Sequence, residues 1–265
     1  MASISEIAKQ TKQPYGGYLN PKKFTVISDF QNSVPLEGEN IRATIIGATV
    51  KHLTQFCLSG DLGASFSQSL AGYFLGGDEL PAPIVIRNNQ EQEMNIVDVL
   101  MNVSQNLSTR AVASASVASA FDIWGEDMET AFIMRSPWDN LPNVETVGHI
   151  REMVKTSCLF FRKYGPVTKV NADFSSGYTK ELDAGTGDIV TEDTIWTVKV
   201  TKGKLSSKHT LQAALTYLLA GRTDEECFRQ IKNIGVWNPR TGLAYTVNAE
   251  KVKTELEIIG RAIFL

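Results

Sequence analysis

The sequence contains few of the residues that form metal centres and disulfide bonds. Its 265 residues include only three histidines and three cysteines, and neither type is clustered. No spacing among them fits a zinc site, and three widely separated cysteines predict reduced thiols rather than disulfides. A zinc module and a disulfide-rich secreted domain are therefore not expected.

The motifs of several large enzyme classes are also missing. The chain has no GxGxxG, no P-loop, no GxSxG and no HExxH. No apolar run approaches the roughly 20 residues that span a bilayer. The first residues lack the basic region and apolar core of a secretory signal. We therefore expect a cytoplasmic protein with no membrane partner.

Charge and size set further bounds. The net charge of −3 argues against a protein that coats nucleic acid with a basic surface on every side, but it is compatible with a local basic patch. A chain of this length can bury one large core or two modest ones.

The chain divides into three regions that differ in composition and in predicted secondary structure. Residues 1–23 are polar and contain prolines and glycines, which predicts a loosely packed arm. Residues 24–143 are predicted to be mainly helical, because apolar positions between Ile41 and Cys57 recur with a helical period. Residues 144–265 begin with another helical pattern and then change, after Pro166, to short strands rich in β-branched residues.

The order of elements in this last region is predicted as β-β-β-α-β. The strands are expected at Val167–Tyr178, Gly187–Val190 and Thr194–Val200, followed by a helix containing Leu211 and Leu215. Asn238–Gly242 has the turn chemistry of a hairpin between two further strands. A final helix is expected from about Glu250, and the fold class is α/β.

Two neighbouring strands place a carboxylate and a lysine where they could act together. Residues i and i+2 of a strand share a face, so Thr197 and Lys199 point the same way and Asp188 can face them from the preceding strand. A carboxylate that holds magnesium and a lysine beside the bound water are what metal-dependent hydrolysis of a phosphodiester needs.

This arrangement resembles the core of the PD-(D/E)XK nucleases, in their RecB-like branch. The resemblance covers about 100 residues, roughly 144–249. It implies a mixed sheet flanked by helices, with Mg²⁺ or Mn²⁺ as cofactor and DNA or RNA as partner. It assigns Asp188 as the metal-binding acid and Lys199 as the catalytic lysine.

The same resemblance implies roles for residues on two helices. Gln212 would lie beside the active site, and Tyr217 would contact nucleic acid, although it falls one position beyond the usual Gln-x-x-x-Tyr spacing. The helix before the first core strand would supply His149 or Glu152, and Glu152 would be a second metal ligand.

One residue departs from the family pattern. Thr197 stands where these nucleases keep their second acid, and a neutral ligand should weaken magnesium binding. Glu192 and Asp193, at the turn between the strands, either replace the missing acid or simply solvate a hairpin. Catalysis is therefore expected to be impaired or altered.

The charges of the last region are unevenly distributed. Six acids and one base lie between Asp173 and Asp193, whereas eight bases and three acids lie between Lys199 and Arg240. An acidic pocket beside a basic rim suits a cation and a polyanion. Lys202, Lys204 and Lys208 are accordingly predicted to bind nucleic acid.

Three functions remain open from the sequence. The first is a metal-dependent nuclease of phage, prophage or defence type with an altered site. The second is a catalytically silent nuclease fold that binds nucleic acid or a protein. The third is a structural assembly protein that contacts a partner or a second copy through its helical half.

Overall fold

The structure is a computed structural model that describes residues 3–76, 80–87, 90–122, 136–180, 182 and 184–264. The chain forms two compact units. One consists of residues 1–33 together with 156–265, and the other of residues 34–155. The first unit is therefore built from two separate stretches of the sequence.

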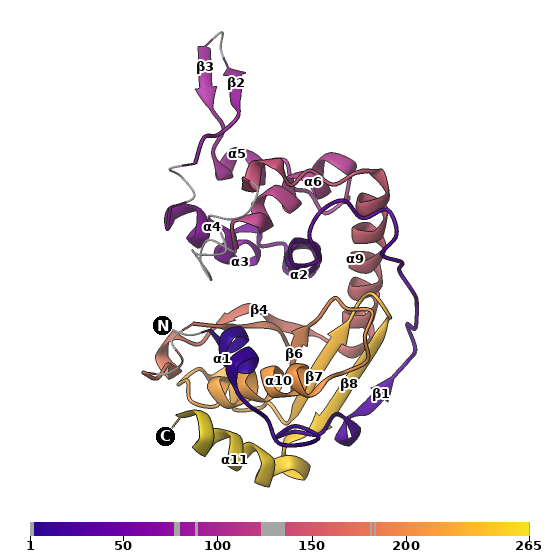
Figure 1. Cartoon of the computed structure of the whole chain (residues 1–265), viewed down its shortest axis with the longest axis vertical. Coiled ribbons are helices and arrows are strands. Elements are labelled where there is room, and N and C mark those ends of the chain that lie inside the picture. Colours follow the sequence, from indigo (N-terminus) through magenta and orange to yellow (C-terminus); the bar gives the residue numbers. More distant parts are fainter. Residues whose placement is uncertain are drawn as a thin grey trace. The chain divides into compact units, whose positions relative to one another are not determined.

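A mixed six-stranded sheet organises the first unit, in the order β1-β8-β7-β6-β5-β4 (Figure 1). All neighbouring strands are antiparallel except β6 and β7, which are parallel. The strands are β1 (Thr25–Ile27), β4 (Val167–Asp173), β5 (Thr186–Thr191), β6 (Thr194–Val198), β7 (Asn233–Asn238) and β8 (Leu243–Asn248). This sheet with its flanking helices confirms the predicted α/β class.

Helices cover both faces of this sheet. Helix α10 (Ser207–Ala220) crosses from β6 to β7, and its Leu211 and Leu215 belong to the same buried cluster as Val190 and Ile195 of the sheet. The last turns of α9 (Val144–Tyr164) cover the other face, where Phe160 packs on Trp196 and Trp237. The predicted antiparallel pairing of β5 with β6 and the packing of α10 on the sheet are both confirmed.

The predicted hairpin joins β7 to β8. Gly242 has a φ of 61°, and a Cβ there would lie 1.7 Å from the carbonyl oxygen of Phe30, so only glycine fits. A short 3₁₀ helix, η6 (Ala249–Val252), follows β8 and leads into α11 (Lys253–Phe264). Three further 3₁₀ turns belong to this unit: η1 (Pro21–Lys23), η4 (Ser175–Gly177) and η5 (Glu226–Phe228).

The N-terminal residues are not the loosely packed arm that their composition suggested. Helix α1 (Ile4–Gln10) begins with a capping box, in which Ser3 and Glu6 exchange side-chain and backbone hydrogen bonds. Ile4 and Ile7 are buried in the same cluster as α10. The expectation failed because one buried face on a seven-residue helix outweighs the polar character of its surroundings.

In its described residues, the second unit is largely helical, with one hairpin. Its elements are α2 (Ala43–Ser59), α3 (Leu62–Ser65), α4 (Ser67–Phe74), β2 (Ile84–Arg87), β3 (Gln90–Glu93), α5 (Ile96–Leu100), α6 (Thr109–Ala120), η3 (Pro137–Asp139) and the first part of α9. The hairpin was not predicted from the sequence. Parts of the region predicted as mainly helical, residues 77–79, 88–89 and 123–135, lie outside the described ranges.

A polar network is buried inside this helical unit. His52 on α2 is fully buried, and its Nε2 lies 2.7 Å from Oδ2 of Asp122. The hydroxyl of Ser69 on α4 donates to the other carboxylate oxygen at 2.6 Å. On its far side, the His52 Nδ1 faces the amide oxygen of Gln55 at 3.3 Å. Both ring nitrogens of His52 and both carboxylate oxygens of Asp122 thus have partners inside the unit.

Crossing a bilayer requires a helix that is both long and apolar, and none of the helices in the described part of the chain meets that requirement.

Candidate nucleic-acid and metal site

Asp188 stands where β5 and β6 separate. The strands pair at Ile189 with Trp196 and at Val190 with Ile195. One residue further, Oδ2 of Asp188 accepts a hydrogen bond from the backbone N–H of Val198 at 2.8 Å. The backbone N–H of Val198 points toward β5, and the carboxylate of Asp188 accepts its hydrogen bond in place of a strand carbonyl. This contact occupies one of the two carboxylate oxygens.

The predicted partners of Asp188 share its side of the sheet. Val190 and Ile195 face α10. Since side chains alternate along a strand, Asp188 and Thr197 face α10 as well, and the charge of Lys199, one residue beyond β6, acts on His209 of α10. Thr197 is only 6% exposed, and Lys199 follows the last residue of β6, where its backbone N–H bonds the carbonyl of Trp237.

Cationic side chains gather around the first turn of α10. Burial lowers the pKa of His209, and the positive charges of Lys199 and Lys208 lower it further. Both lysines therefore lie close enough to His209 for their charges to act on it. Lys202 and Lys204 are exposed in the loop that joins β6 to this turn. The four predicted lysines thus lie on one short stretch leading into a helix N-terminus, whose backbone dipole also favours anions.

Gln212 is already engaged by the N-terminal helix. Its Nε2 donates to the hydroxyl of Ser5 on α1 at 2.6 Å, and the residue is 6% exposed. The side chain of Gln212 therefore contacts α1. It can lie beside a bound nucleic acid, as predicted, only if α1 also lies at that site.

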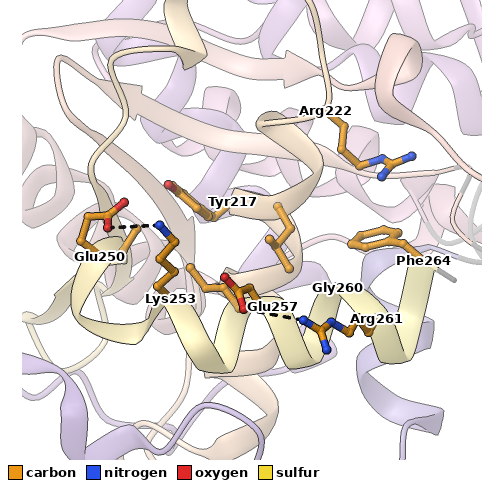
Figure 2. Close-up of a pocket in the computed structure, with 11 residues that line it drawn as sticks. Tyr217, Arg222, Glu250, Lys253, Glu257, Gly260, Arg261 and Phe264 are labelled. Carbon is orange, nitrogen blue, oxygen red and sulfur yellow. Dashed lines mark ion pairs between the residues drawn. The ribbon is translucent and has the colours of Figure 1, made fainter.

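Tyr217 lies on a different side of α10 from Gln212. Five residues along a helix correspond to a rotation of roughly 140°, and Tyr217 lines a groove between α10 and α11 (Figure 2). Burial raises the pKa of its hydroxyl, and the charge of Glu250 raises it further. The structure therefore separates the two residues that the family resemblance pairs.

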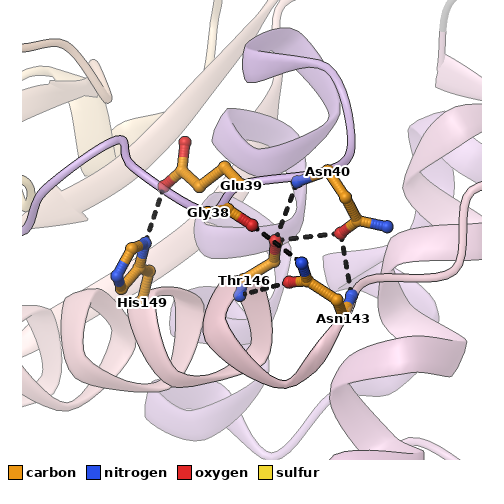
Figure 3. A network of polar contacts seen from close by, with 6 residues as sticks. All are labelled: Gly38, Glu39, Asn40, Asn143, Thr146 and His149. Carbon is orange, nitrogen blue, oxygen red and sulfur yellow. Dashed lines mark hydrogen bonds and ion pairs between the residues drawn. The ribbon is translucent and has the colours of Figure 1, made fainter.

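The residues predicted from the helix before β4 have other neighbours. His149 Nδ1 lies 3.2 Å from Oε1 of Glu39, beside a network in which Asn40, Asn143 and Thr146 tie a loop to the start of α9 (Figure 3). Glu152 is exposed and belongs to the unit of residues 34–155, whereas Asp188 belongs to the other unit. A joint role for Glu152 and Asp188 in metal binding stays a prediction.

The acids of the β5–β6 turn differ in their surroundings. Asp193 accepts hydrogen bonds from the side chains of Thr194 and Asn233, at 2.7 and 2.9 Å. Its backbone carbonyl also receives the N–H groups of Lys232 and Asn233. Asp193 therefore fixes the turn against β7, while Glu192 is exposed beside it. Glu181 and Asp183, counted among the acids near the site, lie outside the described residues.

Sequence reasoning missed one unusual residue next to Asp188. On β4, Asn171 has a φ of 46°, a left-handed conformation that is uncommon for any residue but glycine. It lies between the pairs Val170–Ile189 and Ala172–Gly187, so it is level with Asp188 on β5. Asparagine is among the residues that tolerate this conformation, but nothing in the local sequence pattern marks it within a strand.

The donors present do not make a good magnesium site. Mg²⁺ prefers oxygen ligands with negative charge, yet Asp188 has one oxygen committed to Val198 and its neighbour Thr197 is neutral. Within the described ranges, no three histidine, cysteine, aspartate or glutamate side chains come together as a metal cluster. The described side chains around Asp188 therefore do not fit the ion that the family resemblance implies.

Comparison of the chain with family models, with curated proteins and with solved structures finds no match.

Proposed function

We propose that the sheet-containing unit is a nuclease-like domain that binds nucleic acid at the start of α10 and does not cleave it efficiently. The observation that carries the proposal is the set of four lysines at this turn, all within residues 199–208, between the end of β6 and the first turn of α10. These lysines lie on the same side of the sheet as Asp188 and Thr197. Asp188 and Thr197 together supply one carboxylate, where the PD-(D/E)XK pattern has two.

The chemistry of this turn suits a phosphate backbone. Lysine side chains neutralise phosphates as point charges, and each neutralised phosphate releases counterions, which makes binding strongly dependent on salt. The order of elements expected for a PD-(D/E)XK-like core, with three strands, a helix and a further strand, also supports the proposal. Cleavage is not expected, because the described donors do not fit a magnesium ion.

Replacing Lys199 and Lys208 together with glutamine should weaken binding and lower its dependence on salt. On duplex DNA each phosphate contact contributes about 0.9 to the slope of log K against log salt concentration, so the double variant should lose roughly 1.5 to 2 of that slope. Fluorescence anisotropy with labelled single- and double-stranded DNA and RNA measures it.

Lys251→Gln is the matched control, because Lys251 is an exposed lysine on η6, away from this turn. It should leave affinity and slope unchanged. Equal losses in both proteins would contradict the proposal. If no nucleic acid binds at all, the alternative functions, contact with a protein partner or a second copy through the helical unit, take its place.

Thr197→Asp should strengthen the magnesium response, which we expect to be weak in the natural protein. The substitution places a second carboxylate on the face that Asp188 occupies, so repulsion should lower the midpoint of thermal unfolding without metal. Magnesium at about ten times its dissociation constant should stabilise this variant by about 1.4 kcal/mol, a shift of roughly 4 °C. Thermal unfolding with and without Mg²⁺ or Mn²⁺ measures this, alongside plasmid and single-strand cleavage.

Two controls sharpen this test. Thr197→Asn has similar size without charge, and Asp188→Asn keeps an oxygen for the N–H of Val198 while removing the carboxylate. Neither change should strengthen the magnesium response, and Asp188→Asn should abolish it in the Thr197→Asp background. Robust cleavage by the natural protein that Asp188→Asn removes would show that catalysis is intact and that the proposal is wrong.

A further inference from the structure

A groove between α10 and α11 forms a second concave site on the sheet-containing unit. It encloses about 530 Å³, within the range of small-molecule sites. Leu218 and Leu256 contribute to its apolar surface. The rings of Tyr217 and Phe264 also line it (Figure 2). The lysines proposed to bind nucleic acid lie at the opposite end of α10, whereas Tyr217, which the family resemblance assigns to nucleic acid, lines this groove.

Arg222 is held in place at one end of this groove. Its Nε donates to the carbonyl of Gly177 at 3.2 Å, and its guanidinium carbon lies 5.3 Å from the centre of the Phe264 ring. Gly177 permits this approach, because a Cβ there would already lie 3.1 Å from the Cβ of Arg222. The guanidinium is thus oriented by a hydrogen bond on one side and an aromatic ring on the other.

The terminal nitrogens of Arg222 remain available for an anion. Within the described part of the chain, the carbonyl of Gly177 and the ring of Phe264 are the partners of Arg222, and neither uses those nitrogens. The other two cations of the groove have acidic neighbours, since Lys253 and Arg261 lie 3.8 Å from Glu250 and Glu257 (Figure 2). Arg222 therefore supplies a positive charge that no described carboxylate offsets.

We propose that this groove binds a small organic carboxylate with an apolar body. The carboxylate would take the paired terminal nitrogens of Arg222, a geometry that a planar guanidinium favours. The body would lie on Leu218, Leu256 and the exposed part of Phe264. This proposal is independent of nucleic-acid binding at the start of α10, because neither Lys199 nor Lys208 contributes to the groove.

The test compares three probes on the full chain by ligand-observed NMR and calorimetry. The probes are 4-phenylbutyrate, its neutral counterpart 4-phenylbutan-1-ol, and inorganic phosphate, which has charge without an apolar body. Phenylbutyrate should bind at least about tenfold more tightly than the alcohol, since a hydrogen bond to a charged group is worth that factor or more. Phosphate should not displace it.

Two substitutions in the groove should remove this binding. Arg222→Gln should weaken phenylbutyrate about tenfold or more while leaving the alcohol unchanged. Gly260→Leu should exclude both, because Gly260 lines the groove on α11 and a Cβ there meets no atom within 4 Å, so the side chain grows into open space. Leucine also has the higher helix propensity, so α11 should still form.

Matched controls are available for both substitutions. Arg229→Gln removes an exposed arginine outside the groove, and Gly148→Leu fills open space on α9 in the same way. Both controls should bind phenylbutyrate as the natural protein does. Equal affinity for acid and alcohol, displacement by phosphate, or unchanged binding in Arg222→Gln would each overturn the proposal. If Gly260→Leu does not fold, the Arg222→Gln result decides alone.

Discussion

Trp237→Ala should lower the free energy of unfolding of the sheet-containing unit by about 3–5 kcal/mol, the usual cost of truncating a buried aromatic residue to alanine. Trp237 is fully buried and stacks on Phe160 with ring centres 4.1 Å apart and planes 8° from parallel. Its indole N–H donates to the hydroxyl of Ser157 at 2.9 Å, which joins β7 to the end of α9. Alanine would remove the stack, the hydrogen bond and most of the buried apolar area at once.

Urea unfolding followed by circular dichroism measures this loss without relying on tryptophan fluorescence. Trp237→Phe should cost less than alanine, because a six-membered ring can still stack on Phe160. The losses are then the donor to Ser157, about 1–2 kcal/mol, and the cavity left by the second ring of the indole. Tyr15→Ala is the matched control, since Tyr15 is fully exposed and should change stability by no more than about 0.5 kcal/mol. A Trp237→Ala protein as stable as the Tyr15→Ala protein would show that the stack does not support the sheet.

Asp122→Ala should destabilise the helical unit by about 2–6 kcal/mol, because two buried donors, on His52 and Ser69, lose their acceptor and each unsatisfied group costs about 1–3 kcal/mol. Its carboxylate accepts hydrogen bonds from both His52 and Ser69 in the interior of that unit. Burial raises the pKa of Asp122, but the charge and hydrogen bond of His52, the charge of Lys51 and the hydrogen bond of Ser69 together hold it below its ordinary value of 3.8. The stabilisation is therefore fully present above pH 3.8 and is lost as the pH falls through the lower pKa of the folded state.

Asp122→Asn separates charge from hydrogen bonding in this network. The amide oxygen can still accept from Ser69, so the loss should be smaller than with alanine. Combining His52→Leu with Asp122→Ala in a double-mutant cycle gives the coupling energy, and the double variant should lose less than the two single losses added together. Asp139→Ala, at an exposed carboxylate, is the control. Additive losses would mean that His52 and Asp122 do not stabilise one another.

The elements that the sequence predicted correctly are those whose signals are local. Strands β5 and β6 are joined by a two-residue turn, the hairpin of β7 and β8 carries a glycine where the chain needs a positive φ, and α10 shows one apolar face. Helix α1 carried a comparable signal, because Ser3 and Glu6 have the spacing of a capping box ahead of Ile7. The prolines and glycines that follow it led the prediction away from a helix.

The hydrogen bonds of the candidate site could not be predicted from the sequence, because they depend on where neighbouring strands separate and on contacts between distant residues. The face shared by Asp188 and Thr197 follows from alternation alone. The hydrogen bond from Val198 to Asp188 depends on where the β5–β6 ladder stops, and the bond from Gln212 to Ser5 joins residues 207 positions apart. No local pattern encodes either contact, so the sequence could predict the position of the Asp188 carboxylate but not the hydrogen bond that one of its oxygens accepts.

The sheet-containing unit is built from two separate stretches of the chain, so its parts are synthesised at different times. Strand β1 pairs with β8 through Thr25 and Thr246, so about 220 residues must leave the ribosome between the two partners. At a synthesis rate of roughly 5–20 residues per second, the N-terminal strand waits on the order of 10–40 seconds for its neighbour. Residues 34–155 are completed within that interval and are free to fold first, while Ile4, Ile7 and Phe24 still lack the later residues of their buried cluster. The rate of translation, and not only the sequence, therefore sets how long these apolar side chains wait for their packing partners.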